Sequence, residues 1–412
     1  MQARDVSVRP AKAIPSVVAA ALLLLVPVCA TAQSGGMATA VRKDEFQTAA
    51  PYAILIEAQT GTVLFEKSAD QLVAPASLAK LMTTEVVFNE IKEGNLKLDE
   101  EFVVSPNAWR KGGAPSGGST MFAAVHSKIK IADLLQGVII QSANDGCIIL
   151  AEGIAGNEND FSRLMNGRAR ELGLTGSNFT NATGLPDPDM RVTVRDLARL
   201  AQHIVLTYPE FYRWYGEREF TWNKIRQQNR NPLLSLNIGA DGMKTGFTQE
   251  AGYGLVGSAI QNGLRLIVVV NGLKSDKERG DEARRLLEWG FSGFEQRLLF
   301  ADEQVVGHAK VFGGAQSYVA LTGQGRQAIR LMVPRNTTNR IIARIVYRGP
   351  LVAPVRRGQP VGVLKIWRGE RVALEAPLEA MDDIDTGNVA QRAIDAAGEL
   401  VIGVFRAGLK KF

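Results

Sequence analysis

Three short strings contain the residues of this 412-residue chain that could do chemistry. Residues 77–80 read Ser-Leu-Ala-Lys, residues 142–144 read Ser-Ala-Asn, and residues 244–246 read Lys-Thr-Gly. They supply a hydroxyl with a lysine three residues later, a second hydroxyl with an amide, and a cation next to a hydroxyl and a glycine. A serine hydroxyl attacks an acyl group only when a base accepts its proton. Together the strings indicate acyl transfer through a serine ester.

The first string places a nucleophile and a base on one turn of helix. Ser77 follows Pro75, a residue suited to the start of a helix, where the helix dipole is positive. Lys80 lies three residues later and projects from the same face. A lysine accepts a proton only if its pKa falls, which burial and a neighbouring cation, Lys244, would cause. We expect Ser77 to be the nucleophile and Lys80 the general base.

The second string lies at the junction of two apolar segments, where a hydroxyl and an amide need hydrogen-bond partners. Ser142 is expected to pass a proton to the leaving amine. Asn144 is expected to orient Lys80 and to hold the substrate amide. A helix cap is the alternative interpretation of this string taken alone.

The third string is suited to binding an anion. Lys244 and Thr245 together can bind a carboxylate. Gly246 permits close approach of a substrate. If these residues form an edge strand, an extended substrate can pair with it. The backbone N–H groups of Phe247 and Ser77 are then expected to form the oxyanion hole.

The order of the strings is more specific than any one of them. Ser-x-x-Lys recurs at residues 127–130, and Ser-x-Asn recurs at residues 105–107 and 235–237, whereas Lys-Thr-Gly occurs once.

The elements that must position these residues mix helices and strands. The pattern predicts strands at residues 52–56, 62–65, 254–259 and 264–270, and helices at residues 78–89, 131–141, 145–154, 197–204 and 284–289. Thr193 is expected to open a capping box, and Gly290 is expected to end the last helix. We predict an α/β (α+β) catalytic domain over residues 51–299.

Residues 300–385 have a different character. Short strand-like runs separated by Gly, Pro and charged residues lie at residues 304–312, 328–334, 341–347, 361–367 and 371–378. This pattern is typical of a small all-β sandwich or barrel. It contains no catalytic constellation.

The N-terminus is expected to be a secretory signal peptide over residues 1–32. Basic residues precede an apolar run at residues 17–28, and small residues follow at 30–32. An uncleaved anchor is the alternative, but the run is short for a span of roughly 20 residues. Residues 33–50 are interpreted as a tether. Cleavage would leave Cys147 as the single cysteine, which excludes an internal disulfide and favours a core position over a reactive thiol.

The C-terminal residues 386–412 are predicted to form an amphipathic helix. Its apolar face is expected to lie on a membrane surface. Docking on the β domain or on a second subunit is the alternative.

The net charge, the spacing of the histidines and the absence of one motif argue against several classes of function. The net charge of +6 is mild, and no dense basic stretch contains aromatics, so no nucleic-acid binding is expected. The three histidines, His126, His203 and His308, lack metal-ligand spacing. No Gly-x-Ser-x-Gly elbow is present, which argues against an α/β-hydrolase. The proposed chemistry requires no metal or cofactor.

Longer strings around the motifs carry a family resemblance. They lie at residues 75–83, 141–145, 178–186, 229–231 and 241–246. On these strings, over about residues 51–291, the chain resembles the D-alanyl-D-alanine carboxypeptidases, which are low-molecular-mass penicillin-binding proteins of the serine type (peptidase S11). The likeness is weaker through the β domain and the tail.

The resemblance implies a serine β-lactamase/transpeptidase-like catalytic domain followed by the β domain and an amphipathic helix. It implies an acyl-enzyme on Ser77, peptidoglycan stem peptides as substrates, acylation by β-lactam antibiotics, and attachment to the outer face of the cytoplasmic membrane. Arg279 stands where the family places an arginine for the substrate carboxylate. Some members carry His after Lys-Thr-Gly, where this chain has Phe247, so side-chain contacts to substrate differ.

Other readings of the same motifs stay open. A class A β-lactamase would need a glutamate that activates water, and none is assigned here. A transpeptidase would transfer the acyl group to an amine, and a D,D-endopeptidase would use the same site on cross-linked peptides. A binding protein with an inactive site is disfavoured because every catalytic position is intact.

Overall fold

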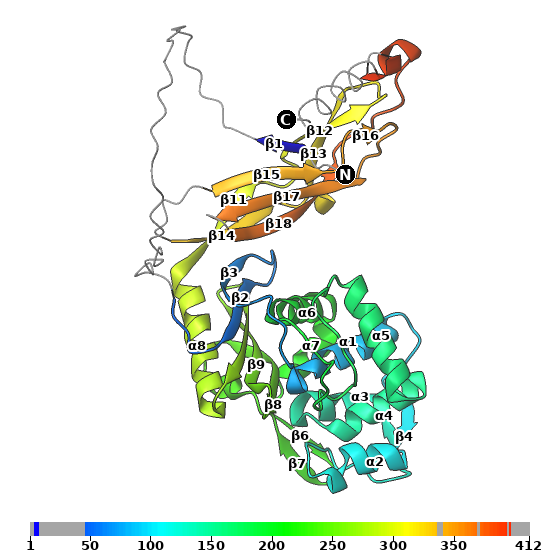
Figure 1. Ribbon diagram of the computed structural model, residues 1–412, viewed down its shortest axis with the longest axis vertical. Coiled ribbons are helices and arrows are strands. Elements are labelled where there is room, and N and C mark those ends of the chain that lie inside the picture. The colour runs from blue at the N-terminus through cyan, green and yellow to red at the C-terminus, as the bar shows by residue number, and fades with distance from the viewer. Residues whose placement is uncertain (1–3, 8–45, 336–340, 369–370, 394, 397–412) are drawn as a thin grey trace, which may run out of the picture.

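The computed structural model describes residues 4–7, 46–335, 341–368, 371–393 and 395–396. A mixed region of helices and strands occupies one end of the molecule, and a region of strands occupies the other (Figure 1). The two regions meet where the hairpin of β2 and β3 approaches β18.

The centre of the first region is a five-stranded antiparallel sheet in the order β3-β2-β10-β9-β8. Its strands are β2 (Tyr52–Glu57), β3 (Val63–Lys67), β8 (Ala240–Thr248), β9 (Gly252–Gln261) and β10 (Leu264–Leu273). The two predicted hairpins are confirmed, and Asn262 and Gly263 between β9 and β10 both have positive φ. The third motif therefore lies on an edge strand, β8, as a bound extended substrate would require.

Both faces of this sheet are covered. Ile267 and Val269 of β10 belong to the core shared with helix α6 (Val194–Thr207), whereas Leu266 and Val268 pack with helix α8 (Asp276–Gly293). This explains why β10 is a nearly continuous apolar run rather than an alternating one.

Helix α8 is longer than predicted. It continues through Gly290 to Gly293. Gly290 lies against the sheet, where an added Cβ would come within 2.6 Å of Leu55 and 2.7 Å of Leu266. The glycine permits close packing instead of ending the helix.

Helix α1 (Lys80–Lys92) is the central helix of the first region, and every residue from Lys80 to Phe88 is buried. Burial on all sides explains its weak amphipathic pattern. The single helix expected at residues 131–141 is instead α3 (Ile131–Gln136) followed by a π-helical turn at Gly137–Gln141. Helices α4 (Asn144–Ala155) and α5 (Glu158–Glu171) follow. The remaining elements of this region are α2 (Pro106–Gly112), α7 (Pro209–Tyr212), β4 (Glu101–Val103), β5 (Lys128–Lys130), β6 (Glu219–Trp222) and β7 (Ile225–Gln228).

The predicted cap of α6 is only half formed. Thr193 Oγ1 accepts a hydrogen bond from the N–H of Asp196, as expected. The Asp196 carboxylate does not return to Thr193 but accepts from Gly176 N and Ser177 Oγ. It fastens a neighbouring turn to the helix.

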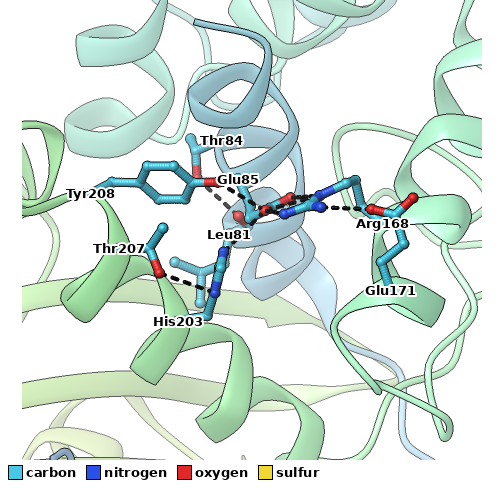
Figure 2. Close-up of polar contacts among 8 residues, drawn as sticks. All are labelled: Leu81, Thr84, Glu85, Arg168, Glu171, His203, Thr207 and Tyr208. Carbon is cyan, nitrogen blue, oxygen red and sulfur yellow. Dashed lines mark hydrogen bonds and ion pairs between the residues drawn. The ribbon is translucent and has the colours of Figure 1, made fainter. Parts of the chain in front are cut away.

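A buried ion network joins α1 to its neighbours (Figure 2). Glu85 of α1 has no solvent exposure, and its Oε1 accepts from Arg168 Nη2 of α5 at 2.7 Å. Tyr208 OH donates to the same oxygen at 3.3 Å, and His203 Nε2 of α6 lies 3.3 Å from it. Arg168 also pairs with Glu171 at 2.6 Å. The network joins α5 and α6 to α1, the helix that begins at Lys80.

The second region is a seven-stranded sheet in the order β1-β15-β17-β18-β13-β12-β16, with a separate two-stranded sheet of β11 and β14. Its strands are β11 (Phe294–Phe300), β12 (Gly307–Phe312), β13 (Tyr318–Gly323), β14 (Ile329–Pro334), β15 (Ile341–Tyr347), β16 (Leu351–Val352), β17 (Pro360–Arg368) and β18 (Arg371–Ala380). All five predicted runs contain strands. The sequence pattern does not predict β11, β13 or β16. A separate apolar core fills this region.

The two chain ends extend from this region. Strand β1 (Arg4–Ser7) pairs antiparallel with β15, although it belongs to the predicted signal peptide. Cleavage after Ala32 would remove β1 and leave β15 at the sheet edge. Residues 389–393 and 395–396 of the predicted tail are helical, and Asp395 Oδ2 accepts from Gly313 N at 2.8 Å. The rest of the signal segment and of the tail lies outside the described residues. Within those residues, no helix has the length and apolar character needed to span a bilayer.

Candidate active site

Ser77 and Lys80 meet as the first string predicts. Ser77 lies in a 3₁₀ turn, Ala76–Ala79, directly before α1. Lys80 Nζ donates to Ser77 Oγ at 2.9 Å and also to the backbone oxygen of Thr183. Lys80 is only 1% exposed. A buried lysine therefore hydrogen-bonds directly to the serine hydroxyl.

The buried environment of Lys80 lowers the pKa of its amine, as a general base requires. Burial, with a smaller contribution from the charge of Arg230, lowers the pKa of Lys80 to about 8, although the charge of Asp145 acts in the opposite direction. A substantial fraction of Lys80 is then an uncharged amine at mildly alkaline pH. Only that form can accept a proton.

Ser142 is buried at the junction that the sequence predicted. It follows the π-helical turn with a φ of 64° and is 2% exposed. The π-helical turn packs on α1. The Ser142 hydroxyl has no hydrogen-bond partner among the described residues, and in particular none with Ser77 or Lys80. A buried hydroxyl without a partner is costly, so a bound molecule is its natural partner.

Asn144 opens α4 beside a loop that the neighbouring carboxylate holds in place. Asn144 N donates to Ser119 O at 2.8 Å. Asp145, fully buried, accepts from Thr120 Oγ1 at 2.6 Å, Met121 N at 3.0 Å and Ala123 N at 3.1 Å. The structure thus fixes the loop next to the second motif. It shows no hydrogen bond from Asn144 to Lys80 within the described residues, so that orienting role stays a prediction.

Cys147 lies one turn further along α4 and is fully buried. Burial raises the pKa of its thiol to about 12, so the thiol stays protonated. The core position predicted for Cys147 is confirmed.

Strand β8 brings the third motif against the turn that carries Ser77. A Cβ added to Gly246 would lie 3.1 Å from both Pro75 O and Leu78 Cγ, a tight contact, so glycine favours this close approach. Lys244 is 3% exposed, and its Nζ donates to Thr245 O at 3.1 Å. Burial, together with the charges of Lys80 and Arg230, holds the pKa of Lys244 well below its usual range. Lys80 and Lys244 therefore share one electrostatic environment.

Arg279 reaches the end of the same strand from α8. Its Nη1 donates to Gly246 O at 3.2 Å, and its guanidinium lies 5.5 Å from the centre of the Tyr253 ring. Burial lowers the pKa of Arg279, which its ion pair with Asp276 opposes. Phe247 is 44% exposed and stacks on Tyr253 with ring centres 4.1 Å apart. The predicted site residues thus lie at the start of α1 and the turn before it, at the start of α4 and the turn before it, on β8, and in the first turn of α8.

The sequence reading gave no role to two groups at this site. Arg230 Nη1 donates to Ser119 Oγ at 2.7 Å, and its charge acts on both lysines. Its string, residues 229–231, carries part of the family resemblance, but the sequence alone assigns Arg230 no role. Thr183 contributes through its backbone oxygen, which every residue type possesses, so no side-chain signal could have identified it.

Comparisons with known proteins agree with this geometry. Residues 37–275 match the family model described as D-alanyl-D-alanine carboxypeptidase, and residues 294–386 match the one described as penicillin-binding protein 5, C-terminal domain. The chain is 41% identical to D-alanyl-D-alanine carboxypeptidase DacC of Escherichia coli over 345 residues, which cover 83% of this chain and 86% of that protein. It is 35% identical to DacA of Haemophilus influenzae over 362 residues, covering 87% and 91% of the two chains.

Solved structures give the same result. Penicillin binding protein 5 from Haemophilus influenzae superposes with a TM-score of 0.71 at 34% identity, covering 83% of this chain and 99% of that one. DacD from Francisella tularensis gives a TM-score of 0.66 at 30% identity, covering 84% and 96%. The predicted fold, a transpeptidase-like α/β domain followed by a β domain, is confirmed. The chain belongs to the D-alanyl-D-alanine carboxypeptidase family of serine penicillin-binding proteins.

Proposed function

We propose that this protein removes the terminal D-alanine from peptidoglycan stem pentapeptides through an acyl-enzyme on Ser77. The observation that carries the proposal is the 2.9 Å hydrogen bond between the buried Lys80 amine and the Ser77 hydroxyl. The strand that would bind the substrate lies beside this pair. The family to which the chain belongs is named for this reaction.

Acylation begins with proton transfer from Ser77 Oγ to the uncharged amine of Lys80. The oxygen attacks the carbonyl carbon of the penultimate D-alanine, and the backbone N–H groups of Ser77 and Phe247 stabilise the resulting oxyanion. Ser142 relays the proton that Lys80 accepted to the nitrogen of the leaving D-alanine, which returns Lys80 to its uncharged form. The C–N bond then breaks, which leaves an ester on Ser77.

Deacylation uses Lys80 as the base a second time. Lys80, again uncharged, accepts a proton from water, and the resulting hydroxide attacks the ester carbonyl. The C–O bond to Ser77 breaks and the serine recovers its proton. All proton carriers in this scheme are side chains of the chain itself.

Substrate contacts are assigned to the surrounding residues. Thr245 and Arg279 hold the terminal carboxylate, with Lys244 contributing positive potential. Asn144 holds the substrate amide, and Gly246 leaves room for the substrate backbone along β8. β-Lactams should acylate the same Ser77, because their strained amide resembles the bond that is cleaved.

The test measures D-alanine release from a pentapeptide ending in D-Ala-D-Ala, with Ser77→Ala as control. Release by the wild type alone supports the reaction and the nucleophile together. Labelling of Ser77 by a fluorescent penicillin without D-alanine release would redirect the assignment to a D,D-endopeptidase. Absence of both release and labelling would overturn the proposal.

We also propose that the chain is exported, that cleavage after Ala32 leaves residues 33–50 as a tether, and that the tail from residue 386 attaches it to the outer face of the cytoplasmic membrane. The support is the residue pattern of both ends. The mature protein should sediment with anionic vesicles, and a variant that ends at residue 385 should stay in the supernatant. Equal sedimentation of both would contradict attachment through the tail.

A further inference from the structure

Arg279, the arginine assigned to the substrate carboxylate, forms an ion pair with an acidic side chain. Asp276 Oδ1 pairs with Arg279 Nη2, three residues later on α8. Arg279 Nη1 is engaged with Gly246 O, and its Nε has no hydrogen-bond partner among the described residues. A carboxylate binds an arginine best through two parallel N–H groups. The Nη2 side of the guanidinium, which such binding would use together with Nε, is therefore shared with Asp276.

The two partners of this ion pair differ in solvent exposure. The Arg279 side chain is only 8% exposed and is fixed by Gly246 and by the ring of Tyr253. The Asp276 side chain is 63% exposed. It stands at the first residue of α8, where the helix dipole stabilises a negative charge without help from arginine. Asp276 can thus turn into solvent at small cost, whereas Arg279 stays in place.

We propose that Asp276 pairs with Arg279 in the free enzyme and competes there with the terminal carboxylate of the substrate. Through this competition Asp276 lowers the affinity of the site for ligands that carry a carboxylate. This inference rests on the proposed function, because it takes Arg279 to be the carboxylate site. Asp276 acts through Arg279 and touches no reacting atom. Its effect should therefore appear in KM and leave kcat nearly constant.

The test compares Asp276→Asn with the wild type in steady-state D-alanine release. Loss of one negative charge next to the arginine should lower KM for the pentapeptide about three- to tenfold. The difference should shrink at high salt, because the ion pair is exposed on one side. An unchanged or a raised KM would overturn the inference, since Asp276 would then be inert or would be needed to hold Arg279.

Two further variants separate this effect from a general change of α8. Asp281→Asn removes the same charge from the same helix, but Asp281 pairs with Lys277 and not with Arg279. It should leave KM within about twofold of the wild type. Asp276→Glu retains a carboxylate three residues from Arg279 and should restore the wild-type KM. If Asp281→Asn lowers KM as much as Asp276→Asn, net charge is the cause and the competition is excluded.

A binding measurement keeps the inference testable if the proposed function fails. In the Ser77→Ala background no acyl-enzyme forms, and the Kd of an acylated D-Ala-D-Ala dipeptide is measured by calorimetry with and without Asp276→Asn. A three- to tenfold tighter Kd supports the competition even without turnover. As a matched probe, the dipeptide amide carries no terminal carboxylate, and its Kd should not change. An equal gain for the amide, or no gain for the acid, would overturn the inference.

Discussion

Arg168 Nη2 lies 2.7 Å from Oε1 of Glu85, a carboxylate with no solvent exposure, and this pair joins α5 to the helix that begins with Lys80. The contact involves none of the motif residues, but it links α5 to α1, the helix that carries Lys80 (Figure 2). A buried charge that loses its partner is strongly destabilising.

Arg168→Met should therefore lower the free energy of unfolding by about 3–5 kcal/mol, because it leaves the Glu85 charge buried without its arginine partner. The double variant Glu85→Gln with Arg168→Met should lose clearly less than the sum of the single variants. Urea denaturation measures all three. Arg284→Met, which breaks the exposed pair with Glu288, is the control and should cost less than about 1 kcal/mol. Equal losses for the buried and the exposed pair would contradict the structure.

Acidification should weaken the same network. Burial alone would raise the pKa of Glu85, but hydrogen bonds from His203 and Arg168 and the charge of Arg168 outweigh it, so the pKa is lowered. A carboxyl with a lower pKa in the folded state stabilises the protein above its unfolded pKa of about 4.3, and this stabilisation is lost as pH falls through the folded value. Thermal unfolding between pH 7 and pH 3 should show a smaller acid-side decrease in Tm for Glu85→Gln. Parallel curves for the two proteins would refute the assignment.

Acylation should accelerate with pH because the reactive form of Lys80 is the uncharged amine. The rate of Ser77 acylation by penicillin should rise through an apparent pKa of about 8 and then level off. Lys80→Arg keeps a long cationic side chain that cannot deprotonate, and it should slow acylation by about 10²–10⁴-fold. A pH-independent rate in the wild type would remove Lys80 from the role of base.

Gly246 should accommodate a side chain poorly. A Cβ there would meet Pro75 O and Leu78 Cγ at 3.1 Å, so Gly246→Ala should displace β8 or the turn that carries Ser77 by a few tenths of an ångström. A shift of this kind should reduce the acylation rate about tenfold, while the fold is retained. Gly167→Ala on α5 is the matched control, since its Cβ would meet no atom within 4 Å. It should keep full activity and slightly raise stability. Wild-type acylation by Gly246→Ala would contradict the close approach.

The sequence by itself determined the elements whose patterns are local. The hairpins around β2–β3 and β9–β10, the Thr193 cap and most strands of the β domain follow from alternation and turn residues over a few positions. The type of reaction also follows from the sequence, because the residue types and the order of the three motifs indicate acyl transfer through a serine. Local patterns failed where a distant contact decided the outcome. Gly290 resembles a helix end, but the side chains of Leu55 and Leu266 require a glycine inside α8.

Only the tertiary structure decided how the motifs meet. The pKa of Lys80 depends on burial by segments far along the chain, and its second hydrogen bond goes to a backbone oxygen, at Thr183, that no side-chain pattern can reveal. The position of β8 at the sheet edge follows from the pairing of five strands and not from the string Lys-Thr-Gly. The pairing of Asp276 with Arg279 needed the fold as well, because an acidic residue three positions before an arginine is common on exposed helices. This pair is significant here because Arg279 is buried against Gly246 and Tyr253, next to the third motif.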